Sequence, residues 1–151
     1  MASMEGHTAV VELLLASGAS VDRADARGLS SLFIACQIGH LPVVELLLAA
    51  HASVDKPVDN GATSLYVACQ NNHIALVDML LAADAFVDAA LTNGPGVGFT
   101  PLLTASQKGQ TAVVMRLLAA GASQDIAVGT ITPIKIAKQQ KQTAVVELLD
   151  V

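Results

Sequence analysis

One segment recurs five times along the chain, and this recurrence constrains the fold more than any other feature of the sequence. GHTAVVELLLASGASVD begins at Gly6, and related segments begin at Gly39, Asn72, Gly109 and Lys141, at steps of 33, 33, 37 and 32 residues. A second segment keeps the same period: SSLFIAC, TSLYVAC, TPLLTAS and TPIKIAK begin at residues 30, 63, 100 and 132. A period of this length predicts an array of repeats in which each unit packs only on its neighbours.

Each repeat carries the signals for two helices. The first helix is predicted to follow an N-cap hydroxyl and to end at a residue that tolerates the left-handed conformation. The caps are Ser30, Thr63, Thr100 and Thr132, and the ends are Gly39, Asn72, Gly109 and, less suitably, Lys141. The second helix is apolar on almost every side, so neighbouring helices must cover it. Small residues that allow close approach recur on the first helix, at Ala35, Ala68, Ala105 and Ala137.

The pattern of T-P-L-x-x-A, G-H, V-V-x-L-L-L and G-A within 33 residues resembles the ankyrin repeat, and the resemblance extends from Glu5 to Asp150. It implies an all-α solenoid of stacked helix-turn-helix units with β-hairpin fingers between them. The finger tips would lie at residues 26–28 and 59–61, and the third finger would carry four extra residues. The predicted single domain, residues 1–151, comprises a partial repeat (4–24), repeats at 25–57 and 58–90, a repeat with the longer finger at 91–125 and a capping-like repeat at 126–151.

Composition and charge exclude several classes of function. The net charge is -5 and the basic residues are scattered, so the chain has no basic stripe that would bind nucleic acid. No apolar run approaches the roughly 20 residues of a membrane-spanning helix. Met1 to His7 lack the features of a secretory signal, and two cysteines form no disulfide framework. We therefore expect a protein of a reducing compartment, cytoplasmic or nuclear, without membrane insertion.

Histidines and cysteines recur one repeat apart, and both patterns are predicted to be structural. His7, His40 and His73 would lie about 10 Å apart, which is too far to share a zinc ion. The resemblance implies instead that the Gly-His pairs stabilise the turns between helices through side-chain to backbone hydrogen bonds. Cys36 and Cys69 are expected to be small buried residues beyond disulfide distance. We predict no metal ligand and no cofactor.

Two further patterns have a catalytic interpretation that the sequence does not favour. Asp22, Asp55, Asp88 and Asp125 form a ladder, which we expect to be solvated at the finger edge with no nucleophile or base beside it. The stretch NGPGVGF at residues 93–99 precedes a helix, so that a nucleotide-binding enzyme using the loop from Gly94 to Gly98 is a remote alternative. That loop lacks the Gly-Lys-Ser/Thr ending of a phosphate loop and the βαβ context of a dinucleotide site. We interpret it as the lengthened finger, where partner specificity is expected.

The resemblance implies that a protein partner binds the concave surface formed by finger tips and first helices. The matching positions are Arg27, Leu29, Gln37, Ile38, Asp59, Asn60, Tyr66, Gln70, Asn71, Val97, Phe99, Gln107, Lys108, Ile131 and Gln139. Tyr66 and Phe99 are candidate anchors because aromatic side chains carry a large share of binding energy. Alternatively, Phe33 and Tyr66 pack between fingers and helices. The predicted function is non-catalytic binding of an unidentified protein or peptide.

The two ends of the sequence suggest different expectations. Nothing before Glu5 supplies a first helix to cover the apolar segment from Thr8 to Ala16. The chain would then be a regulatory or targeting segment of a larger enzyme or channel, or it would self-associate through this half repeat. At the other end, Lys135, Lys138 and the run from Gln139 to Gln142 make the last first helix polar, and we expect the array to end there.

Overall fold

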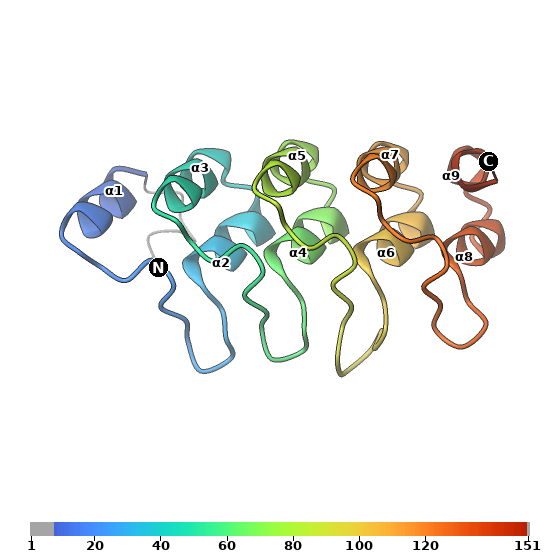
Figure 1. Cartoon of the computed structure of the whole chain (residues 1–151), viewed down its shortest axis with the longest axis horizontal. Helices are drawn as coiled ribbons and strands as arrows, with labels where there is room; N and C mark the ends of the chain where they lie inside the picture. The colour runs from blue at the N-terminus through green and yellow to red at the C-terminus, as the bar shows by residue number, and fades with distance from the viewer. Residues whose placement is uncertain (1–7, 151) are drawn as a thin grey trace.

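The computed structural model describes residues 8–150, and in this part of the chain the helices form two rows (Figure 1). The first helices of the repeats are α2 (Ser31–Ile38), α4 (Ser64–Gln70), α6 (Pro101–Lys108) and α8 (Pro133–Gln139). The second helices are α1 (Thr8–Ala16), α3 (Leu41–Ala49), α5 (Ile74–Ala82), α7 (Thr111–Ala119) and α9 (Thr143–Leu149). Helices α2 to α9 pair within repeats, and each pair packs on the next. The predicted all-α solenoid is confirmed.

The first helices begin where an N-cap hydroxyl accepts a hydrogen bond. Ser30 Oγ accepts from Phe33 N at 3.2 Å. The same bond, to the amide three residues on, is made by Thr63 (3.3 Å), Thr100 (3.2 Å) and Thr132 (3.4 Å). Pro101 and Pro133 occupy the first helical position, where a missing N–H costs nothing. The predicted caps therefore position each first helix and satisfy one of its unpaired amide groups.

Residues in the left-handed conformation end the helices. Gly39 and Gly109 end α2 and α6 with φ of 85° and 69°, and Asn72 and Lys141 take the same place with φ of 58° and 57°. The second helices end likewise at Gly18, His51, Asp84 and Gly121. This conformation costs a residue with a Cβ about 1 kcal/mol. It persists at Lys141 because the helices on both sides fix the turn between them.

The core runs through the whole array. Ala35, Ala68, Ala105 and Ala137 are fully buried between successive first helices. Leucine and valine side chains of the second helices complete this core; Val44, Val77 and Val114 are also fully buried. Small residues in one row and branched aliphatic residues in the other therefore allow the pairs to stack closely.

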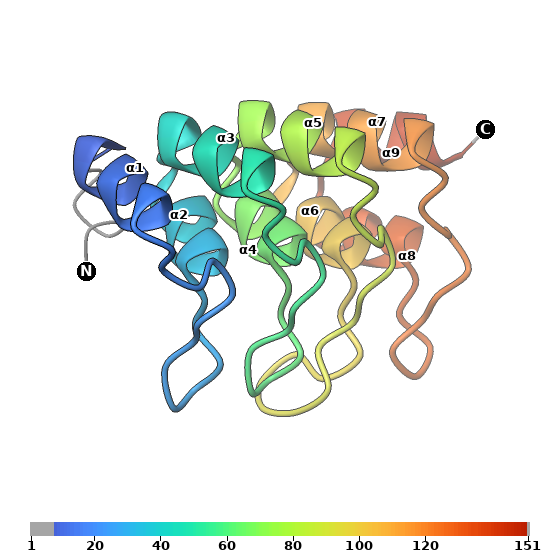
Figure 2. The ribbon, with the colours of Figure 1, turned by 60° about the vertical axis from the view of Figure 1, so that its left-hand side comes forward.

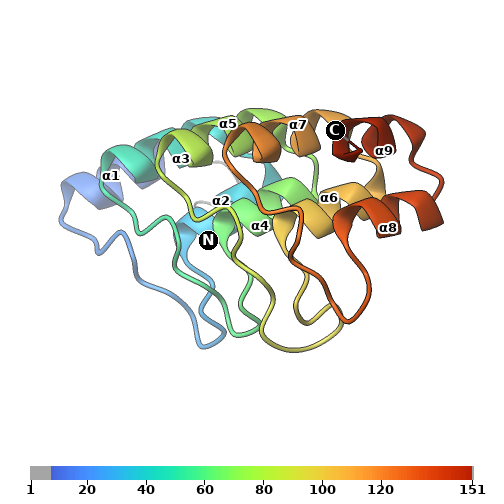
Figure 3. The ribbon, with the colours of Figure 1, turned by 45° about the vertical axis from the view of Figure 1, so that its right-hand side comes forward.

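The fingers are irregular loops that project from the row of first helices on one side of the array, as Figures 2 and 3 show. Within residues 8–150 they contain two isolated β-bridges, Ala24 with Ser30 and Val128 with Ile131, and no extended strand. The β-hairpin detail of the expected fold is therefore not confirmed. Gly28, Gly61 and Gly98 take equivalent places with φ near 80° in the first three fingers, at 78°, 86° and 84°.

Candidate functional site

The third finger is ordered by its own backbone. Leu91 N donates to Phe99 O at 3.0 Å, and Gly98 N donates back to Leu91 O at 2.8 Å. Phe99 N and Val97 N donate to Gly96 O and Gly94 O. Three amides of the loop, those of Val97, Gly98 and Phe99, are therefore bonded within the finger itself. The finger presents Val97 with 51% of its surface exposed.

Neighbouring fingers are joined by single backbone hydrogen bonds. Asp59 N in the second finger donates to Arg27 O in the first at 3.1 Å, and Thr92 N in the third donates to Asn60 O at 2.8 Å. Asn93 Nδ2 adds a bond of 2.8 Å to Asp59 O. A Cβ added at Gly61 would lie 2.7 Å from Thr92 N, so glycine is required for this close approach. These links hold the first three finger tips in a row.

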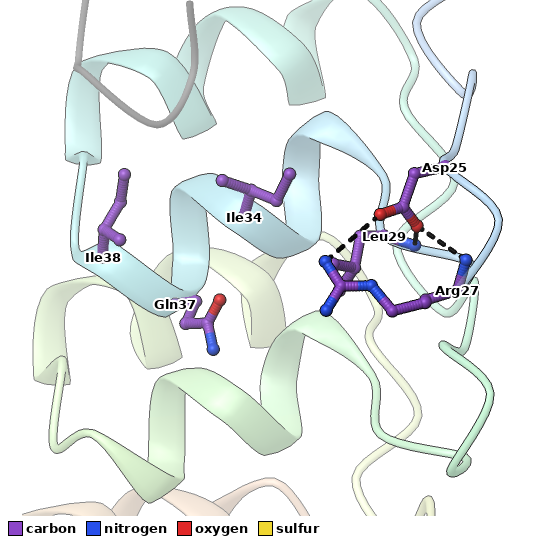
Figure 4. Close-up of a pocket in the computed structure, with 6 residues that line it drawn as sticks. All are labelled: Asp25, Arg27, Leu29, Ile34, Gln37 and Ile38. Carbon is purple, nitrogen blue, oxygen red and sulfur yellow. Dashed lines mark hydrogen bonds and ion pairs between the residues drawn. The ribbon is translucent and has the colours of Figure 1, made fainter. Parts of the chain in front are cut away.

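A hollow of about 310 Å³ lies between the first finger and α2 (Figure 4). It is lined by Asp25, Arg27, Leu29, Ile34, Gln37 and Ile38, four of which the sequence predicted as partner-binding residues. Asp25 Oδ1 accepts from Leu29 N at 2.9 Å and from Arg27 N at 2.8 Å. The bond from Leu29, with the amide and guanidinium of Arg27, lowers the pKa of Asp25. The finger turn thus brings a charged pair to the rim of the hollow.

The predicted partner-binding residues differ in exposure. Exposed are Arg27, Gln37, Ile38, Asp59, Asn60, Gln70, Asn71, Val97, Lys108 and Gln139, and half-buried are Leu29, Phe99, Gln107 and Ile131. We call these residues the finger-helix face. Within it, Asn60 Oδ1 accepts from Ala62 N, while Asn71 Nδ2 and Lys108 Nζ donate to carbonyl groups of the preceding repeat.

Tyr66 is not part of this face, and its prediction as an exposed anchor is wrong. Its side chain is only 4% exposed, and its hydroxyl accepts from Thr104 Oγ1 at 2.9 Å. Burial raises the pKa of Tyr66. Phe33, at the equivalent position on α2, is 5% exposed. The alternative, in which these two rings pack between fingers and helices, accounts for this burial.

The Gly-His turns are linked between repeats and not within them. His73 Nε2 lies 3.3 Å from Gln37 O in the preceding repeat, and its ring occupies the space where a Cβ at Gly39 would lie. His40 and His73 make no side-chain cap on their own second helices. The same link to the preceding repeat continues from Gln110 to Gln70 O (3.4 Å) and from Gln142 to Gln107 O (3.5 Å). His7, for which the same structural role was expected, lies outside the described residues.

The aspartate ladder joins one repeat to the next. Asp22 Oδ1 accepts from Ser53 N at 2.8 Å, and the Ser53 hydroxyl bonds the other carboxylate oxygen. The bond recurs from Phe86 N to Asp55 (2.9 Å) and from Ser123 N to Asp88 (3.1 Å). The hydroxyl and then the amide of Ser53 lower the pKa of Asp22. The carboxylates are still reached by solvent, as expected, and the recurrence of aspartate at the start of every finger was the signal for this additional role.

The cysteines are isolated in the core. Cys36 and Cys69 are fully buried and free, and burial raises the pKa of each thiol to about 12. Within residues 8–150, no three His, Cys, Asp or Glu side chains gather in a group that could hold a metal ion. The helices of the same region are all too short or too polar to cross a membrane.

Two family models match the chain. The model for ankyrin repeats in three copies matches residues 1–90, and the model for a single ankyrin repeat matches residues 97–128. The chain belongs to the ankyrin repeat family. Ankyrin repeats are generally protein-protein interaction modules and are typically non-catalytic. No curated protein matches the chain. The residues between the two ankyrin matches, 91–96, lie in the long third finger.

Proposed function

We propose that this ankyrin array binds a protein or peptide partner, without catalysis, through the finger-helix face. One observation carries the proposal: in the first full repeat, finger and helix residues together line a hollow of about 310 Å³. The equivalent residues of later repeats continue on the same row of helices and fingers. Partner binding uses such preformed hollows because little has to be ordered when the partner arrives.

The charges of the face favour a partner with mixed polar and apolar groups. Arg27 pairs with Asp25 at 3.4 Å, and Lys108 Nζ donates to Gln70 O at 2.8 Å. With the carboxylate of Asp59 also on the face, positive and negative groups are balanced, and little net charge is left to attract a highly charged partner. Ile38 and Val97 add apolar area, with 40% and 51% of their surfaces exposed. An interface of this kind is held by apolar contacts and hydrogen bonds together.

A matched pair of variants tests the proposal. Val97→Asp places a charge on the third finger, and Met115→Asp makes the same change on α7, in the row of second helices. The two side chains are equally exposed, at 51% and 53%. In affinity capture from cell extract with quantitative mass spectrometry, Val97→Asp should lose partners that Met115→Asp retains. Equal retention by both variants, or loss confined to Met115→Asp, would contradict the proposal.

A further inference from the structure

A glutamine occupies the same place near the end of α2, α4, α6 and α8. These residues are Gln37, Gln70, Gln107 and Gln139. The following position varies between apolar, polar and charged residues: Ile38, Asn71, Lys108 and Gln140. Three of the glutamines are exposed, and Gln107 is half-buried. The row therefore presents one repeated chemical group along the finger-helix face.

Packing within the array does not account for these side chains. The links between repeats use the main-chain oxygens, since Asn71 Nδ2 and Lys108 Nζ donate to Gln37 O and Gln70 O at 2.9 and 2.8 Å. Any residue type would supply such a carbonyl group. The side-chain amides of the four glutamines make no hydrogen bond within the part of the chain that the structure describes. Each keeps donor and acceptor groups for another molecule.

The spacing of the row matches an extended polypeptide. Neighbouring first helices pack in contact, so equivalent residues lie about 10 Å apart. Three residues of an extended segment in the polyproline II conformation span about 9 Å and complete one turn, so every third residue faces the same side. A glutamine amide can pair with the N–H and the C=O of one residue, which belong to two successive peptide groups. These groups are available in an extended segment, whereas in a helix they are bonded within the helix itself.

The hollow beside α2 lies at one end of this row. Leu29, Ile34 and Ile38 give it an apolar lining, and Gln37 borders it (Figure 4). The charges at its rim are balanced because Arg27 lies 3.4 Å from Asp25. The hollow therefore suits a large, uncharged, apolar side chain.

We propose that the array binds an extended, uncharged peptide segment whose backbone pairs with the four glutamines and whose apolar side chain fills the hollow beside α2. This inference rests on the proposed function and adds the conformation and chemistry of the partner. Three intervals of about 10 Å require a segment of about ten residues. In the polyproline II conformation every third residue meets a glutamine.

A random library of twelve-residue peptides, displayed on phage and selected on the full chain, supplies the probes. The selected peptides are synthesised with a fluorophore, and their dissociation constants are measured by fluorescence anisotropy. Each peptide is then scanned by N-methylation, which removes one backbone N–H at a time. The double variant Gln70→Leu/Gln107→Leu removes two central amides at nearly constant volume. Gln124→Leu, on an exposed residue after α7, is the matched control.

We expect N-methylation to weaken binding at every third position of the peptide. Gln70→Leu/Gln107→Leu should raise the dissociation constant by at least tenfold, since each lost hydrogen bond weakens binding roughly fivefold. Gln124→Leu should bind as the unchanged chain does. Selected peptides should carry a large apolar residue near one end, and changing it to Asp should weaken binding.

Three outcomes overturn the inference: no peptide is enriched, the N-methyl scan lacks a period of three, or binding survives Gln70→Leu/Gln107→Leu. Weakening at most positions would indicate a helical partner, because N-methylation removes the hydrogen bonds of the helix itself. In each case Val97→Asp and Met115→Asp separate the two proposals. If Val97→Asp still abolishes partner binding while the glutamine variant has no effect, the finger-helix face remains the binding surface and only the extended-peptide inference fails.

Discussion

Helices α1 and α9 contain the same seven residues, TAVVELL, at residues 8–14 and 143–149, yet their surroundings differ sharply. Val10 is 45% exposed in α1, whereas its counterpart Val145 is fully buried. Leu14 is 49% exposed, whereas Leu149 is 5% exposed. Helix α9 packs on α8 of its own repeat and on α7, while α1 packs on α3 with no first helix of its own among residues 8–150. Burial is therefore decided by position in the array.

On the opposite side of the same two helices the difference in exposure is reversed. Val11 in α1 is 4% exposed because the next repeat covers it, and its counterpart Val146 in α9 is half-buried. Val146 lines a hollow of about 410 Å³ together with Lys138, Lys141 and Thr143. A second helix contacts the first helix of its own repeat on one side and the following repeat on the opposite side. The comparison thus separates contacts within repeats from contacts between them.

The reactivity of thiols should show the largest difference between the interior of the array and the exposed side of α1. In the variant Val10→Cys, one thiol lies on the exposed side of α1, and Cys36 and Cys69 remain buried with pKa values of about 12. At pH 8 we expect the new thiol to react with a chromogenic disulfide roughly a thousandfold faster than the native pair, because the thiolate is the reacting form. All three should react alike in urea. Comparable rates in the folded chain would contradict the buried placement.

Truncating the matched leucines should separate the two ends of the array. Leu149→Ala removes a buried side chain, and we expect a loss of about 2 to 3 kcal/mol in the free energy of unfolding. Leu14→Ala removes a side chain that is half in water, and the loss should be under about 1 kcal/mol. Urea denaturation, with the slope checked for two-state behaviour, measures both. Equal losses would show that α1 is covered in solution.

Self-association would be one way of covering α1. Leu13, Val10 and Leu14 expose 68%, 45% and 49% of their surfaces on this helix. We predict that the chain self-associates through α1 and that Leu13→Lys raises the dissociation constant at least tenfold, a change of about 1.4 kcal/mol. Met115→Lys makes the same change on a similarly exposed residue of α7 and should leave association unaltered. Sedimentation equilibrium that finds only monomer at high concentration would refute the prediction.

Substitutions in the aspartate ladder should give the smallest difference in stability between the two ends of the array. Asp22 bonds the next repeat through Ser53, whereas the Asp125 carboxylate makes no hydrogen bond within residues 8–150. Asp22→Asn should cost about 1 kcal/mol at pH 7, a low value for a charge-assisted bond because the carboxylate is reached by solvent. Asp125→Asn should have little effect.

The cost of Asp22→Asn should depend on pH in one direction. The folded chain lowers the pKa of Asp22, so its stabilisation is complete above the ordinary range of a carboxyl, about 4, and is lost as pH falls through the lower folded value. Urea denaturation at pH 7 and below pH 3 should show the two stabilities converging. A difference that grows on acidification would contradict the assignment.

Features set by neighbours along the chain could be predicted from the sequence. Cap hydroxyls such as Thr100 and left-handed ends such as Asn72 act within four residues of themselves, and the structure confirms both. The repeat period also predicted the stacked helix pairs. By contrast, the bond between Tyr66 and Thr104 joins residues 38 apart, and that from Ser53 to Asp22 joins residues 31 apart. Such bonds depend on how one repeat is rotated against the next, which no local pattern specifies.

The sequence by itself determined the repeat period, where the helices begin and end, and which residue types form the core. The tertiary structure alone decided which copies of a shared motif are covered. TAVVELL has the same helical preference at both ends, since helix formation depends on local conformation and spacing. Its burial depends on the helices placed beside it, and for this reason Leu14 is exposed while Leu149 lies in the core.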